Sequence, residues 1–137
     1  MTDVLQGSEG PSEGSMAGKK KMREKAAELG VGTHQRHIFL CCDQSKPKCC
    51  SLEQGLKSWD HLKSRLHDLE LDVPGKVFRT KANCLRVCAN GPIALVMPDN
   101  VWYHSCTPKV LDTIIDEHLL QGKPVEEYRI IPQPDNQ

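Results

Sequence analysis

The sequence predicts an α/β protein with a four-stranded mixed sheet and two main helices, in the order β-α-β-β-β-α. Four short apolar segments rich in strand-forming residues begin near residues 37, 76, 92 and 101. Two longer segments carry apolar residues at spacings of three or four, which places them on one face of a helix. Because a long helix separates the first two strands, we expect those strands to be parallel with a right-handed crossover.

The first strand and the first main helix have the clearest local signals. His37–Cys41 is short, apolar and typical of a buried strand. The helix should run from about 52 to 69, because Ser51 is a suitable N-cap and Gln54 completes a capping box. Its apolar face is expected to carry Leu52, Leu56, Trp59, Leu62, Leu66 and Leu69.

The second half of the chain supplies three strands and a helix. Lys76–Thr80 is the expected second strand, and Pro92–Met97 and Val101–His104 form a hairpin around a Pro-Asp-Asn turn. The last helix should begin with Thr107 as its N-cap and Pro108 at its first position. We expect its buried face to carry Val110, Leu111, Ile114, Ile115, Leu119 and Leu120.

The order of these elements matches the core of a thioredoxin-like fold, although a fold alone does not decide function. We expect the folded domain to span residues 36–131, followed by a short tail at 132–137. Residues 1–35 are rich in Gly, Ser, Lys and Glu. They should form a disordered or partly helical extension, with any helix lying within 19–29.

Composition and charge exclude several functions. The chain has 137 residues and a formal net charge of +0, which argues against a protein built to bind nucleic acid. It contains no apolar stretch of the roughly 20 residues that a membrane span needs. The polar N-terminus does not resemble a secretory signal, so we expect a cytoplasmic location.

The cysteines are the main candidates for chemistry. There are seven, an odd number, and in a reducing compartment a disulfide framework is not favoured. Parallel strands joined by a crossover end at the same edge of the sheet, so the segments that follow the first two strands should be neighbours. This topology brings thiols distant in sequence to one rim of the domain: Cys41, Cys42, Cys49, Cys50, Cys84 and Cys88.

Convergent thiolates have three uses: a zinc site, an iron–sulfur cluster, or thiol–disulfide exchange. Cys84 and Cys88, with three residues between them, suit a zinc knuckle. Cys41 is separated from Cys49 or Cys50 by seven or eight intervening residues, which is long for a knuckle but tolerable for a wider 2Fe–2S cluster. The Cys-x-x-Cys spacing of thiol exchange does not occur. Spacing therefore favours a cluster and leaves the other two uses open.

Several motifs resemble those of thioredoxin-like 2Fe–2S ferredoxins, a family related to the small 2Fe–2S subunit of respiratory NADH dehydrogenase. They are HIFLC at 37–41 with KPKCC at 46–50, CLRVCANGP at 84–92, VMPDNVWY at 96–103 and the segment 118–126. The resemblance implies a one-electron carrier and not an enzyme. It also implies one 2Fe–2S cluster per chain, redox partner proteins and a homodimer. Charge and the lack of a long apolar stretch, as noted above, argue against nucleic acid or membrane partners.

By this resemblance the cluster ligands fall on Cys41, Cys84, Cys88 and one of the adjacent pair Cys49 and Cys50. We prefer Cys50, because it immediately precedes the helix, and keep Cys49 as its competitor. The alternatives are a zinc-stabilised or metal-free binding module and a thiol oxidoreductase on the same fold.

The other cysteines are expected to have structural roles. The side chain of Cys42 should point to the opposite face of its strand from that of Cys41. Cys106 should be a small buried hydrophobic residue. We also expect backbone N–H groups between Arg86 and Gly91 to donate hydrogen bonds to cluster sulfurs.

Overall fold

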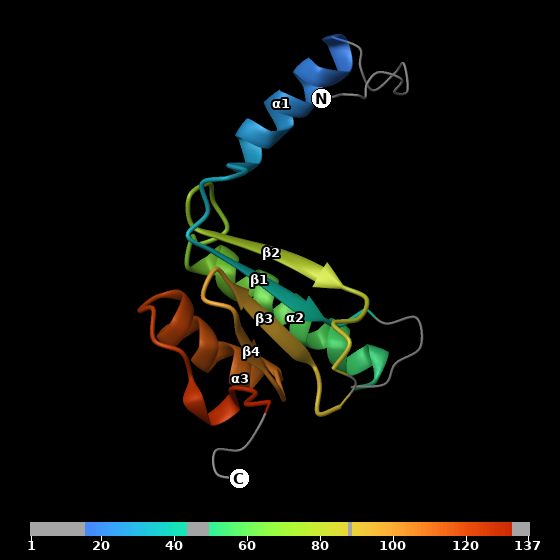
Figure 1. Ribbon diagram of the computed structural model, residues 1–137, viewed down its shortest axis with the longest axis vertical. Helices are drawn as coiled ribbons and strands as arrows, with labels where there is room; N and C mark the ends of the chain where they lie inside the picture. Colours follow the sequence, from blue (N-terminus) through green and yellow to red (C-terminus); the bar gives the residue numbers. More distant parts are fainter. Residues whose placement is uncertain (1–15, 44–49, 88, 133–137) are drawn as a thin grey trace.

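The computed structural model describes residues 16–43, 50–87 and 89–132. Its four strands are β1 (Arg36–Cys41), β2 (Val77–Ala82), β3 (Ile93–Met97) and β4 (Val101–Tyr103). They form one mixed sheet in the order β2-β1-β3-β4 (Figure 1), which confirms the predicted α/β fold class.

Strand register fixes the orientation of the sheet. β1 pairs with β2 in parallel from Arg36 opposite Val77 to Cys41 opposite Ala82, as the crossover predicted. β1 pairs antiparallel with β3, and β3 pairs antiparallel with β4 as the expected hairpin. β2 ends at Ala82, two residues beyond the predicted end at Thr80, because it follows β1 to its last residue.

The crossover helix α2 spans Leu52–Asp68. The capping box is confirmed: the Gln54 N–H donates to Ser51 Oγ at 3.1 Å, and the Ser51 N–H donates to Gln54 Oε1 at 3.2 Å. Leu52 was expected on the buried face but is 41% exposed, because the first turn extends past the apolar core. The buried positions are Gly55, Ser58, Trp59, Leu62 and Leu66.

The last helix begins as predicted and then changes its winding. α3 spans Pro108–Thr113 with Thr107 as its N-cap, and a π-helical segment, η3, continues from Ile114 to Leu119. The prediction for Leu120 is wrong, since this side chain is 49% exposed. A π turn holds more residues than an α turn, as the hydrogen bond from the Leu120 N–H to the Ile115 carbonyl shows. This winding turns Leu120 outward and His118 into the core.

Helices α2 and α3 cover the same face of the sheet. The main apolar core combines alternate strand residues, such as Ile38 and Val96, with Leu62 of α2 and Leu111 of α3. A smaller cluster on the other face contains Cys41 and Ile93, with Leu85, Trp102 and Ile130 packed against them. No helix contributes to this second cluster among the described residues, so the face opposite α2 and α3 is comparatively open.

The ends of the chain extend the sheet domain. Helix α1 (Met16–Leu29) includes the expected helical segment 19–29 and begins within the stretch 1–18 that was expected to be disordered. It has no buried residue and extends away from the sheet (Figure 1). Near the C-terminus a 3₁₀ turn, η4, spans Glu126–Tyr128, after which Arg129 bridges to Tyr103. In the described part of the chain, no helix is long and apolar enough to span a membrane.

Candidate metal centre

The ends of β1 and β2 form the rim at which the thiols were expected to meet. Cys41 is the last residue of β1 and lies opposite Ala82, the last residue of β2. The chain after β2 continues through Asn83 to Cys84, and the Cys41 thiol donates to the Asn83 carbonyl at 3.9 Å. The parallel register therefore brings the Cys41 and Cys84 segments to the same edge, as the topology predicted.

Adjacent cysteines on β1 face opposite sides of the sheet. Cys41 is 1% exposed and packs with Ile93 on the open face. Cys42 belongs to the main core on the helix-covered face, so the predicted opposition of the two side chains is confirmed. Burial raises the pKa of the Cys42 thiol to about 12. Cys42 is therefore a protonated core thiol near neutral pH.

Helix α2 packs closely against the backbone at the end of β1. A Cβ placed on Gly55 would lie 2.6 Å from the Cys42 carbonyl oxygen, so only glycine permits this approach. Cys50 immediately precedes the N-cap Ser51 and is partly buried. Burial, and then the nearby Cys41 thiol, raise the pKa of Cys50.

The loop after β2 is bent so that an N–H points at a sulfur. Arg86 has φ +76°, a left-handed conformation that a non-glycine residue rarely adopts. Its N–H donates to Cys84 Sγ at 3.2 Å. For Arg86 this confirms the expected N–H donation to a candidate ligand sulfur.

Two of the predicted ligand positions, Cys49 and Cys88, lie outside the described residues. The choice between Cys49 and Cys50 therefore stays a prediction, as does ligation by Cys88. Within residues 16–43, 50–87 and 89–132, no group of three His, Cys, Asp or Glu side chains is arranged to hold a metal ion.

Cys106 is remote from this chemistry. It is fully buried in the main core, and its thiol donates to the His104 carbonyl at 3.7 Å. Burial raises the pKa of Cys106 far above its ordinary value of 9.0. Cys106 is the buried apolar residue that the sequence predicted.

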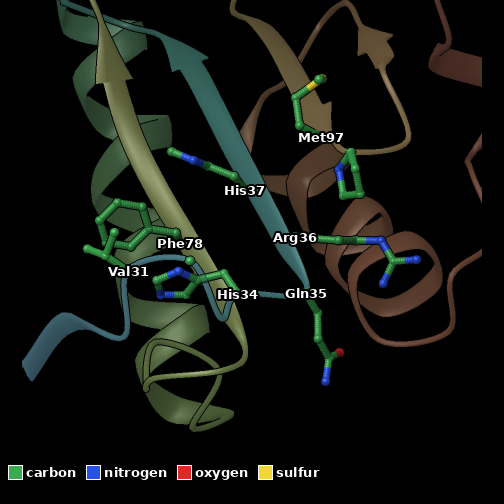
Figure 2. A pocket seen from close by; sticks show the side chains of 9 residues that line it. Val31, His34, Gln35, Arg36, His37, Phe78 and Met97 are labelled. Atoms are coloured by element: carbon green, nitrogen blue, oxygen red, sulfur yellow. The ribbon is translucent and has the colours of Figure 1, made fainter. Parts of the chain in front are cut away.

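A pocket of about 430 Å³ lies at the start of β1, at the other end of the strand from Cys41. Figure 2 shows His37 and Phe78 on neighbouring strands lining it, with Arg36 pointing away from His37. His34 stacks on Phe78 with ring centroids 4.5 Å apart. His37 lies 2.6 Å from Thr80 Oγ1, through its Nε2. These histidines are satisfied by local partners and do not reach the thiols.

The structure also contains a buried polar network that the sequence did not reveal. His118 is fully buried, with Nδ1 2.8 Å from the Tyr103 hydroxyl and Nε2 2.5 Å from Asp99 Oδ2. Arg36 Nε donates to the same Asp99 oxygen at 3.1 Å, and the Val125 N–H donates to the Tyr103 hydroxyl at 2.9 Å. The network joins β1, the β3–β4 turn and the last helix, and its role is structural.

Comparisons with known proteins point to one family. No protein-family model matches the chain. A 2Fe-2S ferredoxin of Aquifex aeolicus (strain VF5) is 43% identical over 100 residues, which cover 69% of this chain and 88% of that protein. A 2Fe-2S ferredoxin of Clostridium pasteurianum is 25% identical over 104 residues, covering 70% and 96%. A crystal structure of the thioredoxin-like [2Fe-2S] ferredoxin from Aquifex aeolicus matches with a TM-score of 0.60 and 27% identity, over 70% of this chain and 96% of that one.

Proposed function

This chain belongs to the thioredoxin-like 2Fe–2S ferredoxin family, and on that basis we propose that it binds one 2Fe–2S cluster and carries single electrons between redox partner proteins. The proposed ligands are the thiolates of Cys41, Cys50, Cys84 and Cys88, with Cys49 as the competitor of Cys50. The main support from the structure is the parallel β1–β2 register, which brings the Cys41 and Cys84 segments to one rim. We assign this function to the domain at residues 36–131.

The described residues fit a cluster in three respects. When bound, a 2Fe–2S cluster accepts and donates one electron. Cys41 is nearly inaccessible, so its sulfur would be shielded from water on the protein side. Cys84 is exposed, so the outer edge of the site is open to a partner. The Arg86 N–H that donates to Cys84 Sγ stabilises negative charge on that sulfur, and such bonds raise the reduction potential.

Thiol exchange fits these residues less well. The reactive species in thiol–disulfide exchange is the thiolate, which requires a lowered pKa. Burial instead raises the pKa of the thiols of Cys42, Cys50 and Cys106. We therefore prefer the function of an electron carrier over that of an oxidoreductase with its own substrate. We also place the protein in the cytoplasm, where thiols stay reduced before they bind iron.

The open face of the sheet supports the homodimer that the resemblance implies. Phe39, Phe78, Leu95 and Trp102 lie on this face and are only partly buried, and Met97 is 37% exposed. An apolar sheet face is normally covered, and a contiguous exposed apolar area marks an interaction site. We propose that a second copy of the chain covers it.

The experiment that tests the cluster is an absorption spectrum of anaerobically purified protein, with iron and acid-labile sulfide assayed on the same sample. We expect charge-transfer bands in the visible region that bleach with dithionite, and about two irons and two sulfides per chain. A protein that stays colourless after reconstitution with iron and sulfide would refute the proposal.

A further inference from the structure

A second groove lies beside the cysteine rim, between the first turns of α2 and α3. It has a volume of about 480 Å³, within the range of ligand-binding clefts. Its walls come from both helices and from the segment that precedes β3: Gln54, Ser58, Gly91, Pro92, Thr107 and Pro108. Lys57 and Lys109 complete the lining.

The groove combines an apolar interior with a basic mouth. The rings of Pro92 and Pro108 supply carbon surface, and Ser58 is buried beneath it. Lys57 and Lys109 are exposed, and among the described residues neither takes part in an ion pair. No acidic residue lines the groove. This surface suits an apolar side chain that is flanked by carboxylates.

The groove lies near the end of β1 that carries Cys41, because Pro92 in its wall precedes Ile93, which pairs with Cys41. Gln54 lies in the first turn of α2, four residues after Cys50, and Gly91 follows the loop that begins at Cys84. A partner segment seated in the groove would therefore lie near the end of the sheet that carries the proposed ligand Cys41.

The local charge also favours an acidic partner. Around the rim and groove, Lys57, Lys109 and Arg86 have no described acidic partner, whereas Lys81 pairs with Asp43 at 3.5 Å. Glu53 is the acidic residue in the first turn of α2. A cluster held by four thiolates is negatively charged, so an acidic partner would be repelled there unless nearby cations offset that charge.

We propose that this groove docks an acidic segment of a redox partner, with an apolar side chain in the groove and carboxylates on Lys57 and Lys109. The inference rests on the proposed function, because it identifies the surface at which that site meets its partner.

The test measures binding of a fluorescein-labelled peptide in which one leucine is flanked on both sides by aspartates and glutamates. Fluorescence anisotropy is followed with the cluster-loaded full-length protein, and a carbodiimide then links contacting lysines to peptide carboxylates for mass spectrometry. The Lys57→Glu/Lys109→Glu variant should bind about tenfold more weakly, because two attractions become repulsions. The control variant Lys76→Glu/Lys123→Glu has the same charge change at exposed sites outside the groove and should bind as the wild type does.

Cross-links at Lys57 and Lys109 in the wild type would support the inference. Cross-links confined to Lys19–Lys25 of α1, or equal weakening in both double variants, would overturn it. Absorption of the same samples separates the two proposals. Groove binding without a cluster would refute the proposed function alone, and a cluster-loaded protein that binds independently of Lys57 and Lys109 would refute the docking site alone.

Discussion

Neighbouring cysteines in this chain have different chemical environments. Cys41 and Cys42 are adjacent on β1, yet one lies on the open face near the rim and the other in the main core. The alternation of side chains along a strand allows only one of them to face the rim. Of these two adjacent cysteines, only Cys41 therefore fits the proposed cluster site.

Serine substitutions should separate ligands from buried cysteines. Cys84→Ser and Cys88→Ser are expected to lose the 2Fe–2S cluster or bind it much more weakly, because a hydroxyl is a poorer iron ligand than a thiolate. The measurement is iron content and visible absorption after identical reconstitution. Cys106→Ser is the control and should keep a wild-type spectrum. An unchanged spectrum in Cys88→Ser would show that the ligand assignment is wrong.

Only part of the site could be predicted from single residues. The convergence of Cys41 and Cys84 followed from strand direction, which hydrophobic patterns reveal. The left-handed backbone of Arg86 could not be predicted, because nothing in its residue type favours φ +76°. The sequence also does not decide between the adjacent Cys49 and Cys50 as ligand. Both precede the same helix, and a shift of one residue changes which thiol reaches the rim.

At the scale of elements, α2 is packed against the end of β1 through one glycine. In an exposed helix, Gly→Ala stabilises by about 1 kcal/mol. Gly55→Ala should instead destabilise by roughly 1–3 kcal/mol, because the new Cβ would lie 2.6 Å from the Cys42 carbonyl oxygen and 2.9 Å from its Cα. Urea unfolding of the two proteins gives the free-energy difference. A variant as stable as the wild type would show that this contact relaxes without cost.

The polar network at the last helix predicts acid sensitivity. Hydrogen bonds from His118 and then Arg36 lower the pKa of Asp99 below its ordinary value of 3.8. The unfolded chain therefore binds this proton more readily, so the stabilisation is complete above that value and is lost as the pH falls below it. Asp99→Asn should cost roughly 1–3 kcal/mol at neutral pH, and its deficit relative to the wild type should shrink below pH 4.

Thermal unfolding of both proteins between neutral pH and pH 3 checks this prediction. His61→Gln is a useful control, because His61 also contacts a carboxylate, Asp112, but at the half-exposed boundary between α2 and α3. If Asp99→Asn were less stable than the wild type by the same amount at every pH, the lowered pKa of Asp99 would be contradicted.

Local sequence signals predicted the beginnings of both main helices but not the winding of the second. Each helix cap is formed by residues close together in the sequence, Ser51 with Gln54 and Thr107 with Pro108. Such caps can therefore be predicted from sequence. The π-helical segment has no comparable signal. Within it, His118 contacts Tyr103 and Asp99, which belong to other elements and which a local sequence pattern does not reveal. This is why Leu120 was assigned to the wrong side.

For the whole molecule, the open sheet face predicts the oligomeric state. Leu95 lies between Phe39 and Trp102 on that face, so Leu95→Lys should convert the proposed dimer to a monomer. Size-exclusion chromatography with light scattering measures the mass. Leu120→Lys is the matched control, because this exposed leucine lies on the last helix. A wild-type protein that is monomeric at high concentration would exclude a dimer through this face.

The direction of β1 places the N-terminal helix and the cysteine rim at opposite ends of the sheet. The chain enters the strand from α1 at Arg36 and leaves it at Cys41, so the N-terminal helix joins the sheet at the end away from the thiols (Figure 1). A fusion or tether attached ahead of α1 would therefore leave the cysteine rim uncovered. A protein immobilised through its N-terminus should therefore keep that rim accessible to a redox mediator in solution. The N-terminus is for this reason a suitable attachment point for electrochemistry.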